Sequence, residues 1–147
     1  MKNRFILGVV VTIVLGIITF YPKDIIGIIG KEPNISENAH VRVISRENIE
    51  DSGIANESQS QEHAKEIFDY FTDYKFRRTN KSYSDLDEMA SYTIKITDEG
   101  EEMFFVTIRG DKYISITDKR DNYFSYKLWG DEFDLDYIEE YYQSLNN

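Results

Sequence analysis

The chain has 147 residues, of which 17 are Lys or Arg, 27 are Asp or Glu and none is cysteine. A formal net charge of −10 repels the phosphates of DNA and RNA, so we expect no nucleic-acid partner. The absence of cysteine excludes disulfide bonds, thiol catalysis and thioether lipidation from any role in this protein.

The strongest local pattern lies at the amino terminus. Residues 5–21, FILGVVVTIVLGIITFY, carry no charge and follow Lys2 and Arg4. A helix over this segment would reach about 26 Å, close to the hydrocarbon thickness of a bilayer. Pro22, Lys23 and Asp24 come next instead of a small-x-small cleavage site. We therefore predict an uncleaved signal-anchor, a transmembrane helix that contacts the lipid bilayer through residues 5–21.

The basic residues before this segment set its predicted orientation. A short positive flank tends to stay in the cytoplasm, so the rest of the chain should lie outside. This predicts a single-pass protein of the cell membrane with a membrane anchor over residues 1–30. Residues 31–38, KEPNISEN, are polar and contain Pro33, so they are read as a tether. Residues 39–147 should then form one acidic extracytoplasmic domain.

The first elements of this domain are a strand and a helix. Residues 39–45, AHVRVIS, alternate between apolar and polar and predict a strand. Ser58 and Gln61 then have the spacing of a capping box, which favours the start of a helix. Apolar residues follow at helical spacing and indicate an amphipathic helix. They are Ala64, Ile67, Phe68 and Phe71.

From residue 74 the hydrophobic period changes to two. Five segments show it, over residues 74–79, 91–97, 103–109, 112–117 and 123–129. Glycines in Asp98-Glu99-Gly100 and Gly110-Asp111 suit tight turns, because glycine tolerates a positive φ. Short connections of this kind predict successive antiparallel strands that form a meander.

A second amphipathic helix should close the chain. Acidic residues at positions 131, 132 and 134 precede an apolar stripe of Leu135, Ile138, Tyr142 and Leu145, as expected at a helix amino terminus. The predicted order of the domain is β-α-β-β-β-β-β-α. We therefore predict an α+β fold, in which the transmembrane helix is followed by a small antiparallel meander sheet packed by two helices.

The sequence holds no recognised catalytic motif. Only His40 and His63 occur, without a second ligand at metal-binding spacing, so no catalytic residue, cofactor or metal ligand is predicted. Carboxylates are ligands for hard cations, and the sequence has two clusters of acidic residues. Both clusters lack the glycine and the distal glutamate of a calcium-binding loop. We interpret them as a turn and a helix start. They are Asp85, Asp87 and Glu88, and Asp131, Glu132, Asp134 and Asp136.

Two other clusters have two readings each. The basic cluster, formed by Lys75, Arg77, Arg78 and Lys81, could contact an anionic polymer or an acidic partner. The preferred reading is that these charges protect the edge of a sheet against aggregation. A second set of residues would be a ligand platform if exposed and core if buried, and we expect core. This aromatic set is Tyr113, Tyr123, Tyr126 and Trp129.

Several short motifs resemble those of a family of small membrane-anchored proteins and lipoproteins of Gram-positive bacteria, a domain of unknown function. They are Thr79-Asn80-Lys81-Ser82 with Asp85 after it, Tyr92-Thr93-Ile94-Lys95-Ile96, Tyr113-Ile114, and the segment from Tyr123 through Tyr126 to Lys127. Leu86, Ser115 and Asn122 stand where the family has proline, glutamate and proline. The resemblance implies a location in the cell envelope and a similar fold, and it implies no activity. Its motif positions of unknown role are Thr79, Lys81, Ser82, Asp85, Tyr113, Tyr123, Tyr126 and Lys127.

These observations predict a membrane-anchored extracytoplasmic domain of unknown activity. We expect a non-enzymatic binding or interaction module of the cell envelope, whose partner is a protein or a cell-wall component. Two alternatives remain open. One is a metal-dependent envelope enzyme built on the acidic groups, and the other is an immunity-type protein that protects its own cell against a toxin.

Overall fold

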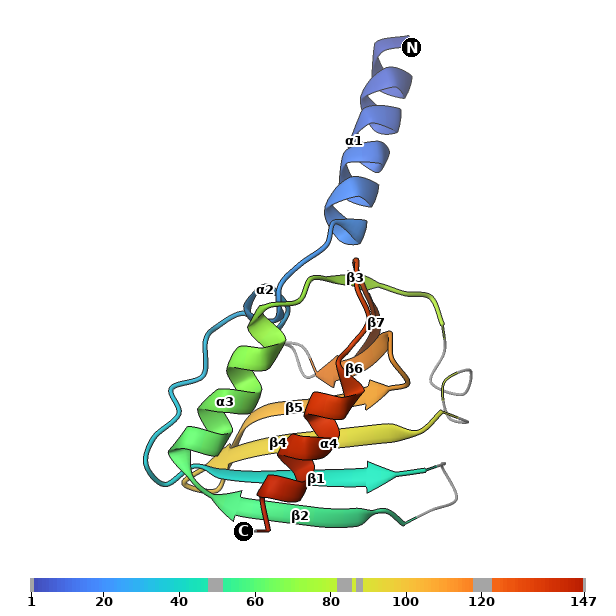
Figure 1. Ribbon diagram of the computed structural model, residues 1–147. Helices are drawn as coiled ribbons and strands as arrows, with labels where there is room; N and C mark the ends of the chain where they lie inside the picture. Colours follow the sequence, from blue (N-terminus) through green and yellow to red (C-terminus); the bar gives the residue numbers. More distant parts are fainter. Residues whose placement is uncertain (1, 48–51, 82–85, 87–88, 118–122, 147) are drawn as a thin grey trace.

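The computed structural model describes residues 2–47, 52–81, 86, 89–117 and 123–146. Within them, seven strands form one antiparallel sheet in the order β2-β1-β4-β5-β6-β7-β3 (Figure 1). The helices are α1 (Lys2–Phe20), α2 (Ile25–Ile29), α3 (Gln61–Thr72) and α4 (Leu135–Ser144). The strands are β1 (His40–Arg46), β2 (Ile54–Gln59), β3 (Phe76–Arg78), β4 (Ser91–Asp98), β5 (Glu101–Arg109), β6 (Tyr113–Thr117) and β7 (Tyr123–Leu128).

The hydrophobic core lies between the sheet and the two amphipathic helices α3 and α4, which cover the same face in Figure 1. Helix α3 begins after Ser60, whose hydroxyl accepts a hydrogen bond from the His63 N–H at 3.2 Å. Phe68 and Phe71 of this helix pack edge-on or tilted against Phe104 of β5, with ring centroids 5.4 and 5.5 Å apart. The core therefore holds α3 against the centre of the sheet.

The segment between α1 and β1 also contributes to this core. Ile25 and Ile28 of the short helix α2 and Ile35 after it are buried in the same cluster. Asp24 caps α2, because its carboxylate accepts a hydrogen bond from the Gly27 N–H at 2.7 Å. Residues placed by the sequence in the anchor and the tether thus pack with the domain.

The prediction of a transmembrane anchor over residues 5–21 is wrong. Among the described residues, no helix combines the length and the apolar character needed to cross a bilayer. Helix α1 ends at Phe20, and removing Lys2, Asn3 and Arg4 from its 19 residues leaves 16 without charge. The predicted single-pass topology and membrane localisation are therefore wrong as well.

The predicted fold class is wrong in its sheet as well. Strand β2 was not expected, because the sequence IANESQ lacks apolar alternation. It forms through backbone pairing with β1, and its inward position is occupied by the buried polar residue Asn56. The meander is also shorter than predicted: β4 to β7 are sequential neighbours, whereas β3 pairs with β7 at the far edge. Strands β3 and β4 follow each other in the chain, with residues 79–90 between them, but they are not neighbours in the sheet.

Candidate functional site: a basic cleft at the β3 edge

Strand β3 forms one outer edge of the sheet and pairs with β7. Phe76 lies opposite Leu128, and both side chains are buried. Because side chains alternate between faces along a strand, the next pair, Arg77 and Lys127, lies on the other face of the sheet, and both residues are exposed. Two basic residues therefore stand directly opposite each other on neighbouring strands at this edge.

A cleft of about 610 Å³ opens beside this pair. Four cationic side chains line it, from β3, β7 and the turn between β5 and β6: Arg77, Arg78, Lys112 and Lys127. Among the described residues that line it, none is acidic. The other lining residues are Thr79, Asn80, Leu128, Trp129 and Gly130. A protein with a net charge of −10 thus concentrates positive charge in one concave surface, which we call the basic cleft.

Backbone contacts fix the walls of the basic cleft. The Trp129 N–H donates to the Lys75 carbonyl at 2.8 Å, and the Leu128 N–H donates to the Lys112 carbonyl at 2.8 Å. The chain then turns at Gly130, whose φ of 117° favours glycine over other residues. These bonds place the β5–β6 turn, β7 and the approach to β3 side by side.

Aromatic rings hold several cations near the cleft. The Arg77 guanidinium lies 5.5 Å from the Trp129 ring centroid, and the Arg78 guanidinium lies 3.8 Å from that of Phe124. Stacking of this kind restrains a guanidinium while leaving its N–H groups available to oxygen ligands. Arg78 and Lys127 form no ion pair with any described residue. The cleft therefore presents pre-oriented donors with unused positive charge.

Lys112 differs, because it already has acidic neighbours. Its Nζ contacts the Glu132 carboxylate and lies 3.9 Å from that of Asp111. The hydrogen bond with Glu132, and then the charge of Asp111, raise the pKa of Lys112. The same hydrogen bond lowers the pKa of Glu132. Glu132 thus acts as an internal anion for Lys112, one of the four cations of the basic cleft.

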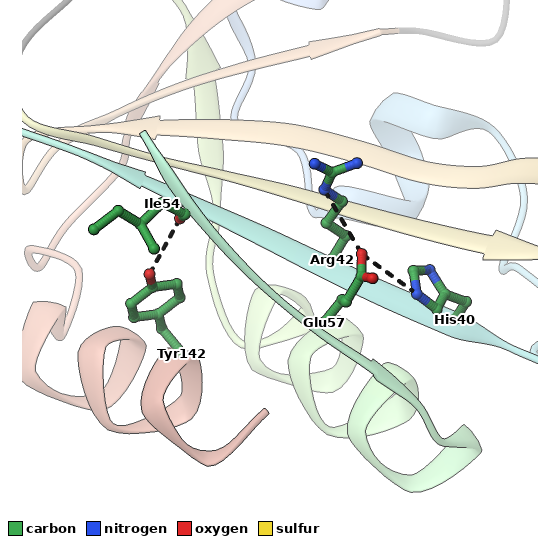
Figure 2. Close-up of polar contacts among 5 residues, drawn as sticks. All are labelled: His40, Arg42, Ile54, Glu57 and Tyr142. Carbon is green, nitrogen blue, oxygen red and sulfur yellow. Dashed lines mark hydrogen bonds and ion pairs between the residues drawn. The ribbon is translucent and has the colours of Figure 1, made fainter. Parts of the chain in front are cut away.

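At the opposite edge of the sheet, basic side chains face an acidic partner. At the β1–β2 edge, Glu57 of β2 lies between two residues of β1, and Figure 2 shows its carboxylate facing both. Its Oε2 is 3.7 Å from His40 Nε2 and 3.9 Å from Arg42 Nε. Arg42 is therefore an exposed cation at an edge that carries its own counter-charge, and it provides a matched control for the basic cleft.

The structure brings some of the family-like motif positions together. Thr79 and Lys127 line the basic cleft. Tyr113 lies opposite Lys127 in the sheet, and Lys81 Nζ is 5.1 Å from the centroid of the Tyr113 ring. Tyr126 is in the core, and Tyr123 is exposed at the other end of β7. Ser82 and Asp85 lie outside the described residues.

Of the aromatic set, only Tyr126 fulfils the expectation of core. Trp129 is 55% exposed and lines the basic cleft, which makes it accessible to a ligand. Sequence reasoning also missed Lys112 and Asn80 as lining residues. The predicted turn at Gly110-Asp111 was the sequence signal that placed Lys112 at the end of a strand. The distance between Lys112 and β3 depends on strand pairing, which the local sequence does not specify.

Within the described part of the chain, the acidic residues form no group of three or more ligands that could hold a metal ion. Asp85, Asp87 and Glu88 lie outside it. In the second group, Glu132 pairs with Lys112, and Asp134 caps α4 by accepting a hydrogen bond from the Tyr137 N–H at 3.0 Å. Both carboxylates therefore have structural contacts.

Comparison with known proteins leaves the site to be interpreted from its own geometry. No protein-family model, no curated protein and no solved structure matches this chain. The resemblance to a Gram-positive family of unknown function therefore stays a prediction.

Proposed function

We propose that this protein is a non-enzymatic binding module that recognises an acidic segment of a partner protein in the basic cleft. The observation that carries the proposal is the row of cations at the β3 edge, where Arg77 and Lys127 lie opposite each other in a protein of net charge −10. A carboxylate bound in the cleft would accept charge-assisted hydrogen bonds from the cationic side chains that line it.

The composition of the cleft supports binding over catalysis. Its described lining residues supply guanidinium, ammonium, amide and indole donors, and include no histidine or carboxylate that could act as a general base. Its cations lie on or beside the outer strand β3, within reach of a partner surface. The acidic remainder of the protein repels long polyanions, which favours a short acidic segment over a nucleic acid.

Edge protection and binding are compatible roles for these cations. Strand β3 is only three residues long, and Phe76 is already bonded to Lys23 through both backbone groups, at 2.7 and 2.9 Å. That bridge blocks strand addition at one end of β3 and leaves the side-chain face to make contacts. Recognition should therefore depend on side-chain charge instead of backbone pairing.

Anisotropy of a fluorescein-labelled oligoglutamate peptide titrated with the full chain tests the proposal. Lys127→Gln should weaken binding about tenfold, because a charge-assisted hydrogen bond is lost. Glu132→Gln frees Lys112 and should strengthen binding about two- to fivefold. Added salt should weaken binding throughout, since exposed charges are screened.

Arg42→Gln is the matched control, because it removes an exposed arginine from the other edge of the same sheet. It should change the affinity less than twofold. Equal weakening by Arg42→Gln and Lys127→Gln would show non-specific attraction and contradict the proposal. Tighter binding of a single-stranded oligonucleotide than of the peptide would also contradict it.

A further inference from the structure

A second cleft lies beside the basic cleft, on the other side of Trp129. Its volume is about 660 Å³. Its walls come from the turn after α1, from the start of α2 and from the residues that flank β3 and β7. They are Tyr21, Pro22, Lys23, Asp24, Gly27, Lys75 and Trp129. We call it the aromatic cleft, because Tyr21, Pro22 and Trp129 give it planar, apolar walls.

The charge of the aromatic cleft is largely internally balanced. Lys75 Nζ lies 3.2 Å from Asp24 Oδ2, so these two groups neutralise each other. Tyr21 is 68% exposed and Trp129 is 55% exposed, although both are large apolar side chains. Exposed aromatic surface in a concave site commonly marks a place where a partner side chain is bound.

The two clefts adjoin at Trp129, which lines both of them. Strand β3 and the residues before it connect them as well: Lys75 faces the aromatic cleft, whereas Arg77 and Arg78 face the basic cleft. Of the two clefts that share Trp129, the basic cleft therefore carries four cations, whereas the aromatic cleft carries exposed aromatic surface with Lys23 as its one cation outside the Lys75–Asp24 pair. A ligand that spans both must carry an anionic part and an apolar part next to each other.

From this juxtaposition we infer that the partner segment is acidic and aromatic: its carboxylates lie in the basic cleft, and an adjacent aromatic side chain inserts between Tyr21 and Trp129. This inference rests on the proposed function and specifies the chemistry of its ligand. The aromatic cleft supplies selectivity, since acidic residues alone occur on many protein surfaces. Burial of one aromatic side chain adds affinity that charge does not provide.

Two labelled peptides test the inference with the full chain. One has a run of glutamates followed by phenylalanine, and the other has alanine in place of the phenylalanine. The phenylalanine peptide should bind about five- to tenfold more tightly, as expected for burial of an aromatic ring. Trp129 is the only tryptophan, so its fluorescence reports on this site directly. Its emission should shift to shorter wavelength with the phenylalanine peptide and change less with the alanine peptide.

Tyr21→Ala separates the two clefts, because Tyr21 lines only the aromatic one. This variant should abolish the preference for phenylalanine and leave the affinity for the alanine peptide unchanged within twofold. Equal affinity of the wild-type chain for both peptides, with Lys127→Gln still weakening both, would overturn the aromatic subsite while the proposed function stands. Failure of both peptides to bind would overturn the proposed function and the inference together.

Discussion

The two edges of the sheet use charge in opposite ways. At the β2 edge, Glu57 faces Arg42 and His40, so opposite groups meet on neighbouring strands. At the β3 edge, Arg77 faces Lys127 across the same kind of antiparallel pair. Two cations in register are destabilising, whereas two opposite charges are mildly favourable. The comparison identifies β3 as the edge at which both members of a cross-strand pair are cations.

The two edges are also attached to the molecule in different ways. Strand β2 is joined to α4 by two hydrogen bonds. Asn56 Nδ2 donates to the Tyr142 carbonyl at 2.9 Å. The Tyr142 hydroxyl donates to the Ile54 carbonyl at 3.1 Å, as Figure 2 shows. Strand β3 is attached by burial of the Phe76 side chain in the core, in addition to its backbone hydrogen bonds with Lys23. A binding edge that rests on a buried anchor can display charged side chains without loosening, which suits the role proposed for the basic cleft.

The largest effect should come from truncating Phe76, the buried anchor of β3. Phe76 is 1% exposed, and its ring contacts Tyr74 and Phe133 in the core. Phe76→Ala should lower the free energy of unfolding by about 3–5 kcal/mol, because it leaves a cavity. The matched change at the other edge is Ile54→Ala, at a residue 70% exposed, and it should cost about 0.5 kcal/mol or less. Urea unfolding of both variants measures the difference, and similar losses would refute the buried-anchor view of β3.

A smaller loss should follow from cutting the hydrogen bonds of β2. Asn56 is 5% exposed, and Asn56→Ala leaves the buried Tyr142 carbonyl without this donor, at a cost of about 1–3 kcal/mol. Tyr142→Phe removes only one hydroxyl and should cost about 0.5–1.5 kcal/mol. Hydrogen exchange should show faster opening of β2 than of β4 in both variants. The exposed pair offers a control, since Glu57→Gln should change stability by about 1 kcal/mol or less.

Periodicity predicted the elements with the clearest pattern. Helices α3 and α4 and the alternating strands β4 and β5 lie where the sequence places them. Strand β2 could not be predicted, because its only buried side chain, Asn56, is polar and its partner α4 is distant in sequence. The predicted anchor is overturned, because no helix among the described residues is long and apolar enough to cross a bilayer.

The candidate site was predictable only in part. The basic cluster was visible in the sequence, and so were Lys127 and Trp129 as separate residues. Their assembly into one cleft depends on β3 crossing to pair with β7, and a period of two contains no information on which strand is the neighbour. Lys112 joins them only because the β5–β6 turn packs against β7.

The smallest expected effect concerns pH and the residues that support β3. The pKa of Asp24 is lowered, first by the hydrogen bond from the Gly27 N–H and then by Lys75. Because the folded pKa lies below the unfolded value, the ionised carboxylate stabilises the fold above the unfolded pKa, and this contribution is lost as pH falls through the folded pKa. Asp24→Asn should therefore be less stable than the wild type at pH 7, and the difference in stability should disappear as the pH falls through the folded pKa of Asp24.

Lys75→Gln distinguishes the two causes of this shift. It removes the ion pair and keeps the Gly27 hydrogen bond, which is the larger cause, so most of the acid sensitivity should remain. Urea unfolding of the wild type and both variants at several pH values measures how the free energy of unfolding of each chain depends on pH. If Lys75→Gln loses the pH dependence as completely as Asp24→Asn does, the ion pair dominates. The β3 edge would then be supported from α2 by charge, in the same way that β1 and β2 share charge at the opposite edge.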